Sequence, residues 1–146
     1  MLKAIFNFEA IDSTRDLCDL FAYLFKKGIY HGGNLIADAV NKSVYISPFR
    51  LISHDGMHVI SDTTITLELK SKGSYYVVCK AKYNTDKDNV LEVSLKTSQQ
   101  IETDSLKNYY VMFGLIQYDG QNEANVIYND IRDVITPIGE KYKGED

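Results

Sequence analysis

Apolar residues recur at helical spacing only near the start of the chain, over residues 13–27. The apolar positions there are Leu17, Leu20, Phe21, Leu24 and Phe25. They fall on one stripe of a helix, and the side chain of Asp12, Ser13 or Thr14 can accept a hydrogen bond from the first turn. Gly28 follows the stripe, as is typical of a helix end. The pattern therefore predicts one amphipathic helix over residues 13–27.

Beyond Gly28 the period of the pattern changes to that of β-strands. Short alternating runs recur every 8–12 residues or so between turn residues, a spacing typical of an antiparallel sandwich or meander. The predicted strands cover residues 43–46, 50–53, 57–60, 64–70, 75–83, 90–96 and 109–118. Ser47-Pro48 ends the first of them, and Asp55-Gly56 suits a tight hairpin turn.

Two of these strands alternate so regularly that one face of each should cover a core. In residues 64–70 the inward positions are Ile65, Leu67 and Leu69, and in residues 90–96 they are Leu91, Val93 and Leu95. Residues 109–118 differ because they are apolar on both faces. Alternation places Tyr109, Val111, Phe113 and Leu115 on one face and Tyr110, Met112, Ile116 and Tyr118 on the other. Such a strand is either central in the fold or pressed against another subunit.

Other segments leave alternatives open. Residues 97–108 suit a long loop or one short helical turn, and residues 124–135 combine strand-like and helix-like features before Pro137. Residues 84–89 should form an exposed hairpin loop. We expect one globular domain over residues 1–138, followed by a charged, mobile tail. The predicted fold class is mainly β with one N-terminal α-helix (α+β), an antiparallel β-sandwich packed against the helix.

Composition sets broad limits on the class of protein. The 146 residues are 45% hydrophobic and 25% charged with a net charge of −4, which is typical of a single globular domain and excludes collagen-like, disordered and coiled-coil classes. No run reaches the ~20 apolar residues of a membrane span, and the N-terminus lacks the apolar core of a signal peptide. We therefore expect a soluble, unexported chain, in which Cys18 and Cys79 are buried thiols.

Candidate chemistry is sparse. The segment from His54 to His58 could offer two imidazoles to a metal, but Asp55-Gly56 makes it an exposed hairpin tip on which they point to opposite faces. His31 beside two glycines has no recognisable nucleophile partner, and phosphate-binding glycine motifs are absent from the sequence. Six lysines against four acids over residues 68–96 favour a solvated sheet face over a nucleic-acid surface. We expect no catalytic residue, no metal site and no cofactor.

Aromatic residues carry more information. Eleven tyrosines and six phenylalanines make up 12% of the chain, and several tyrosines are neighbours on one strand. Adjacent strand residues cannot both face one core, so one of each pair meets solvent, a second layer or a partner. Sheet propensity with a two-layer core explains this as well as an interface does. The residues predicted to form interfaces are Leu17, Phe21, Leu24 and Phe25 on the helix, and Tyr109, Tyr110, Met112 and Phe113 on the last strand.

A family resemblance adds to this picture. The run from Phe6 to Asp16, the helix ending in Phe25-Lys26-Lys27-Gly28-Ile29, and Val44-Tyr45-Ile46-Ser47-Pro48 together resemble the N-terminal module of baseplate and tail-fibre proteins of tailed bacteriophages, chiefly those infecting Gram-positive hosts. The chain departs from the family pattern at Phe49, where glycine is usual. It departs again at Ser74-Tyr75-Tyr76, where the family has R-x-D.

The resemblance implies a virion structural or adaptor protein of a tail, baseplate or fibre. Such a protein is made in the host cytoplasm and supports host attachment by docking to other virion proteins and to copies of itself, with a trimer favoured. It implies no enzymatic activity, nucleic-acid partner or membrane partner. Two other hypotheses stay open from the residues alone: a carbohydrate- or ligand-binding β-module, and a small enzyme that uses His31, His54 and His58.

Overall fold

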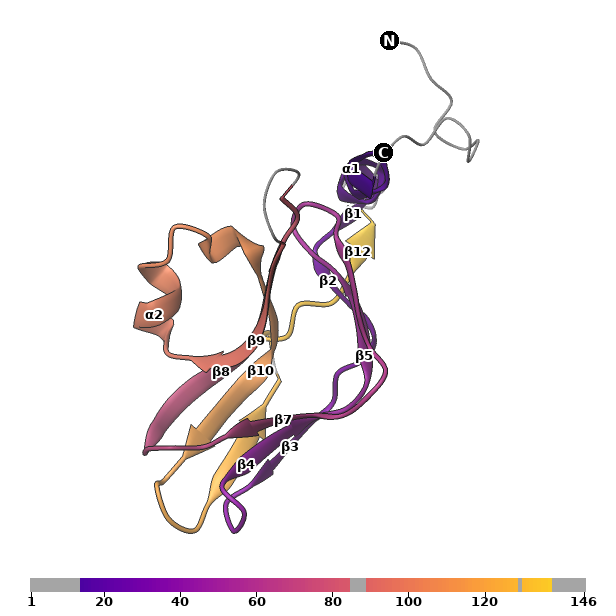
Figure 1. Cartoon of the computed structure of the whole chain (residues 1–146). Helices are drawn as coiled ribbons and strands as arrows, with labels where there is room; N and C mark the ends of the chain where they lie inside the picture. The colour runs from indigo at the N-terminus through magenta and orange to yellow at the C-terminus, as the bar shows by residue number, and fades with distance from the viewer. Residues whose placement is uncertain (1–13, 85–88, 129, 138–146) are drawn as a thin grey trace, which may run out of the picture.

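Antiparallel sheets packed face to face dominate the computed structural model, which describes residues 14–84, 89–128 and 130–137 (Figure 1). The elements in chain order are α1 (Thr14–Leu24), β1 (Phe25–Lys26), β2 (Gly28–Gly32), β3 (Leu35–Asp38), β4 (Ser43–Ile46), β5 (Phe49–Ile52), β6 (His58–Ser61), β7 (Ile65–Glu68), β8 (Gly73–Lys82), β9 (Val90–Lys96), α2 (Ser98–Glu102), η2 (Lys107–Tyr109), β10 (Tyr110–Tyr118), β11 (Ala124–Ile127) and β12 (Thr136–Pro137). The predicted fold class is confirmed.

One layer is the four-stranded sheet β11-β10-β8-β9. The other consists of two three-stranded sheets, β2-β5-β6 and β3-β4-β7, which meet where the chain passes directly from β2 to β3 and from β4 to β5. At that corner Gly33 N–H donates to Pro48 O (3.2 Å) and Ser47 N–H donates to Asn34 O (2.9 Å). An added Cβ on Gly32 would stand 1.9 Å from Pro48 O, so only glycine allows this close crossing. Ser47-Pro48 therefore bends the layer, as well as ending β4.

The main core lies between the layers. Its centre includes Phe49 and Phe113, whose rings meet edge to face with centroids 4.9 Å apart. Both rings are fully buried, together with Val44, Ile46, Leu51, Val77, Cys79 and Val111. A smaller cluster of Val78, Ile101 and Tyr110 lies on the outer face of the four-stranded sheet, under α2. A capping box between Thr97 and Gln100 starts α2, so the short-helix alternative for residues 97–108 is confirmed.

The helix is shorter than predicted. It ends at Leu24, and Phe25 and Lys26 form β1, which pairs with Thr136 and Pro137 of β12. Gly28 does not end a helix, since it belongs to β2. A Cβ on Gly28 would stand 2.3 Å from the backbone nitrogen of Ile135, so glycine is needed there because the C-terminal segment crosses the strand. The capping prediction at Asp12 and Ser13 lies outside the described residues.

The strands β2 and β3 were not predicted, because the glycines at 32 and 33 indicated a turn there. The strands that were predicted contain two errors of detail. Leu91 is 57% exposed rather than inward, because β9 is an edge strand whose first residues project beyond the core. In β10 a bulge between Met112 and Gly114 shifts the pairing with β8 by one residue. Ile116 and Tyr118 therefore face the main core with Val111, not the opposite face as strict alternation predicted.

The ambiguous segment over residues 124–135 is β11 followed by turns that return to β2. Ile29 N–H donates to Asp133 O (2.9 Å), and Ile135 N–H donates to Ile29 O (3.1 Å). Cys18 and Cys79 are both buried thiols, as predicted. Residues 85–88 of the predicted hairpin loop, the N-terminal residues 1–13 and the charged tail lie outside the described residues.

Candidate functional site

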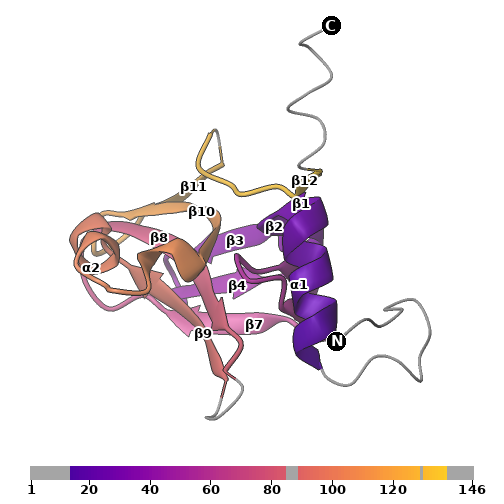
Figure 2. The same cartoon turned by 90° about the horizontal axis from the view of Figure 1, so that it is seen from above.

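One flank of α1 forms an exposed apolar surface. The helix lies at one end of the sandwich beside β2 (Figure 2) and packs through Cys18, which is 3% exposed, onto the turn at Gly56. Leu17 and Leu24 point away from that contact and are 39% and 43% exposed. Phe21 lies between the helix and the sheet, with its ring 6.3 Å from that of His58.

The surface continues from the helix onto the outer face of β2 and β6. The ring of His58 lies 5.4 Å from that of Tyr30, and its Nε2 shares a hydrogen bond with the Tyr30 hydroxyl. Two residues along β6, Ile60 is exposed as well. We call the surface formed by Leu17, Phe21, Leu24, Tyr30, His58 and Ile60 the α1 flank patch. Apolar side chains gathered in this way are typical of a docking surface.

His58 is partly desolvated at this patch, and the effect is seen in its pKa. Burial is the larger cause that lowers the pKa of His58 from its ordinary value, and the neighbouring charge of Arg50 lowers the pKa further. His58 is therefore neutral at pH 7, so the patch carries no imidazolium charge that an apolar partner would have to desolvate. Of the four predicted helix residues, Leu17, Phe21 and Leu24 belong to the patch, whereas Phe25 is a half-buried residue of β1.

The four predicted residues on the last strand divide into two pairs. Tyr110 and Phe113 are buried within their own chain and have no side-chain surface left for a partner. Met112 is half-buried beside the outer cluster. Tyr109 lies in η2, where its ring meets His54 edge to face at 5.3 Å and lies 5.3 Å from Lys82 Nζ. Only Tyr109 and Met112 therefore stay candidates for a contact between subunits.

The turn over residues 53–57 connects the two predicted groups. Gly56 contacts α1 and His54 contacts Tyr109. The turn is itself fixed by Asp55, whose carboxylate accepts hydrogen bonds from the hydroxyl of Ser53 (2.5 Å) and from the backbone N–H of Tyr83 (2.7 Å). The predicted hairpin is confirmed. The prediction that its tip is exposed is wrong for most of the turn, because Ser53, Gly56 and Met57 are buried where the turn contacts α1.

The hydroxyl of the buried Tyr110 is part of a hydrogen-bond network. Its hydroxyl donates to Asp104 Oδ2 (2.6 Å), which also accepts from Lys80 Nζ (2.7 Å), while the backbone N–H of Leu106 donates to Oδ1 (2.8 Å). These hydrogen bonds hold the pKa of Asp104 well below its ordinary value, and the hydrogen bond from Lys80 has the largest effect. Burial and the adjacent carboxylate raise the pKa of Tyr110. The network fixes the loop between β9 and β10 to the sheet.

A second polar network, which was not predicted from the sequence, holds the C-terminal segment. Asp133 Oδ2 accepts from the backbone N–H of Met112 (2.9 Å), and Lys27 Nζ donates to the backbone oxygen of Tyr110 (2.6 Å). Burial raises the pKa of Asp133 and lowers that of Lys27. Arg132 donates to the backbone oxygen of Gly33 (2.8 Å). All of these groups bind backbone atoms, which indicates a structural role.

The groups considered for catalysis or metal binding are dispersed. His54 and His58 contact different rings, and His31 lines a shallow hollow of about 320 Å³ with Tyr30 and Arg50. Among the described residues, no three His, Cys, Asp or Glu side chains are grouped so as to hold a metal ion. Burial raises the pKa of Cys79 to about 12, so its thiol is protonated at neutral pH and is a poor nucleophile.

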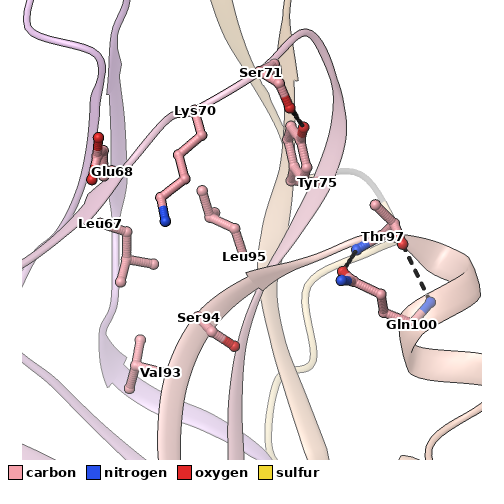
Figure 3. Close-up of a pocket in the computed structure, with 10 residues that line it drawn as sticks. All are labelled: Leu67, Glu68, Lys70, Ser71, Tyr75, Val93, Ser94, Leu95, Thr97 and Gln100. Carbon is pink, nitrogen blue, oxygen red and sulfur yellow. Dashed lines mark hydrogen bonds between the residues drawn. The ribbon is translucent and has the colours of Figure 1, made fainter.

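A larger cavity lies elsewhere, between the edge strands β7 and β9. It has a volume of about 670 Å³ and is lined by apolar side chains such as Leu67, Val93 and Leu95, with Lys70 and Ser94 at its polar parts (Figure 3). This cavity was not predicted from the sequence, since strand order cannot be read from alternation alone.

Comparisons with protein-family models, with curated proteins and with solved structures find no match for this chain. No helix in the described part of the chain is long and apolar enough to span a membrane.

Proposed function

We propose that this chain is a virion structural or adaptor protein of a bacteriophage tail, baseplate or fibre, which acts by docking to copies of itself and to neighbouring virion proteins. The observation that carries the docking role is the α1 flank patch, where Leu17 and Leu24 stay exposed on a helix whose opposite side is packed. The exposed ring of Tyr30 is the kind of group that supplies most of the binding energy at an interface, and the two leucines beside the aromatic rings add apolar area around it.

The assignment to a phage tail rests on the resemblance, and the fold supports it. An amphipathic helix precedes a compact antiparallel β-domain, in the order that the resemblance implies. The Val44-Tyr45-Ile46 run is β4, and Ser47-Pro48 is the corner that follows it. The family's preference for trimers leads us to expect a three-fold contact at the α1 flank patch, in a virion assembled in the host cytoplasm.

The docking role is tested on the helix itself. We expect the wild-type chain to self-associate with rising concentration in light scattering. The double variant Leu17→Asp/Leu24→Asp should lose the three-fold contact, so that its particle mass falls to one third of the wild-type mass. Tyr23→Asp is the matched control, because Tyr23 is 78% exposed on the other flank of the same helix. Equal association of wild type and the double variant, with unchanged melting temperatures, would exclude the patch as the contact.

The tail assignment has a separate test, which is the identity of the neighbouring genes. Genes for other tail and baseplate components on both sides are the expected result. A setting among metabolic genes would contradict the assignment and leave the docking role standing.

A second candidate function is a carbohydrate- or ligand-binding β-module. It is favoured by the hollow of Tyr30, His31 and Arg50, where an exposed aromatic ring for sugar stacking adjoins hydrogen-bond donors. Binding of the folded wild-type protein on a glycan array, lost in Tyr30→Ala and Arg50→Ala, would support it. An array without signal would contradict it.

A further inference from the structure

The sandwich is closed along one side and open along the other. On the closed side β11 packs against β3, and the Tyr128 hydroxyl accepts from the backbone N–H of Leu35 (2.9 Å) and donates to its backbone oxygen (3.2 Å). On the other side, the edge strands β7 and β9 leave the 670 Å³ cavity between them (Figure 3). An additional strand along β9 would cover this cavity.

β9 is the longest edge strand in the described part of the chain. Its seven residues, Val90–Lys96, pair with β8 on one side, so the other side presents a row of backbone N–H and C=O groups. Proteins protect such an edge with like charges, proline or a covering element. β9 instead carries one acid and one base, Glu92 and Lys96, which form an ion pair within the strand (3.2 Å).

We propose that β9 pairs antiparallel with β9 of a second copy of this chain, around a two-fold axis at Ser94. In this register Glu92 lies opposite Lys96 of the second copy, and the symmetry repeats the pair. Val93 lies opposite Leu95 of the second copy on the inner face. Each charged residue near the axis therefore faces a residue of opposite charge, and each apolar residue near the axis faces another apolar residue.

Neighbouring registers lack this complementarity. With the axis at Val93, Glu92 lies opposite Ser94 and both charges lose their cross-strand partners. With the axis at Leu95, Lys96 lies opposite Ser94 instead. Moving the axis by one residue in this way changes the pairing by two positions. A change of pairing by one position would place inner residues opposite outer ones, since side chains alternate between faces. The charge pattern of β9 thus selects one register.

The same pairing covers the cavity. Val93 and Leu95 line it from β9, and alternation puts Val93 and Leu95 of the second copy on the same face, one strand further towards β7. The apolar wall is then shielded from water. This contact is independent of the phage assignment and of the α1 flank patch. It joins two chains by itself, or two trimers if the three-fold contact also forms.

Charge reversal tests the contact in the full-length protein. Light scattering should give wild-type particles of twice the 16.6 kDa chain mass, or of six chains. Glu92→Lys and Lys96→Glu each replace two attractive pairs by two repulsive ones, so the mass should fall by half and association should weaken roughly tenfold. The double variant Glu92→Lys/Lys96→Glu restores both pairs in reversed order, and the mass should recover.

Disulfide trapping tests the register. When Glu92→Cys and Lys96→Cys chains are mixed and oxidised, we expect a cross-linked heterodimer, because the two thiols are opposite each other. Either variant alone should not cross-link, since equal positions are then about 13 Å apart along the strands. Asn125→Cys on β11 is the control for an edge on the closed side of the sandwich. The native thiols are buried and should not interfere.

Three results would overturn the inference. They are a wild-type mass of one chain at all concentrations, a mass that is insensitive to the single reversals, and equal cross-linking in the mixed and unmixed samples. A trimer that is abolished by Leu17→Asp/Leu24→Asp and unchanged by Glu92→Lys would disprove the β9 contact and support the proposed docking role. Failure of the two proposals is therefore distinguishable.

Discussion

The turn at Gly56 should decide whether α1 stays docked. Gly56 has a φ of 84°, and a Cβ there would stand 1.8 Å from the backbone oxygen of Cys18 and 2.8 Å from the nitrogen of Ala22. Gly56→Ala therefore adds a strained backbone conformation, costing about 1 kcal/mol, to a collision with the helix backbone. Ordinary contact begins at 3.4 Å, so α1 must retreat by about 1.5 Å or more.

The cost of that retreat follows from what α1 covers. Cys18 of α1 and Met57 next to Gly56 are both buried in the main core, and a gap of this size removes contacts of both, at a cost of about 2–3 kcal/mol by analogy with core truncations. We expect Gly56→Ala to lose about 3–4 kcal/mol of unfolding free energy. Gly120→Ala is the matched control, with a φ of 89° and only the Lys72 side chain within 3.4 Å, and it should lose about 1 kcal/mol.

Two assays separate the contributions. Urea denaturation gives the unfolding free energies of both variants, and the rate of labelling by a thiol reagent reports on Cys18. Retreat of α1 exposes Cys18, so one thiol per chain should react rapidly in Gly56→Ala and slowly in the wild type and in Gly120→Ala. Cys79 stays unreactive because it lies in the main core. Equal stability losses in the two variants, with Cys18 protected in both, would refute the packing of α1 on this turn.

Three further predictions concern the core and its buried polar groups. Phe113→Ala should lower the unfolding free energy by about 3–5 kcal/mol in urea titrations, because Phe113 fills the space between the layers against Phe49. Asp133→Asn should stay within about 1 kcal/mol of wild type in thermal melts, since it keeps the acceptor for Met112 N–H, whereas Asp133→Ala should lose about 1–3 kcal/mol. Burial raises the pKa of Cys79 from 9.0 to about 12, so the folded state keeps a proton that the unfolded chain releases above pH 9. Wild-type stability relative to Cys79→Val, followed by denaturation from pH 7 to 11, should be constant below pH 9 and fall by about 1.4 kcal/mol per pH unit above it.

Local patterns were sufficient to predict most strands, since alternation reports burial on one face directly. The end of α1 could not be predicted in this way. Lys26 and Lys27 near Gly28 have the composition of a helix terminus, but they leave the helix because β12, more than a hundred residues later, pairs with Phe25 and Lys26. A long-range pairing overrides local propensity here, and no window around Gly28 contains that information.

The candidate site was predicted only in part. Three of the four helix residues belong to the α1 flank patch, because an amphipathic stripe reveals which side chains need cover. Tyr110 was wrongly grouped with surface residues, since its partner Asp104 lies in a polar loop whose fold was not predictable. The cavity between β7 and β9 depends on strand order, which is set by packing of the whole chain.

The bulge in β10 has a consequence for how this fold can vary among relatives. Because of it, one strand supplies side chains to the main core before and after Phe113, while Tyr110 and Met112 serve the outer cluster. Loss of a single residue there would rotate Ile116 and Tyr118 out of the sandwich into water. Insertions should therefore accumulate in the turn that begins at Asp119, while the length of β10 should stay constant through evolution.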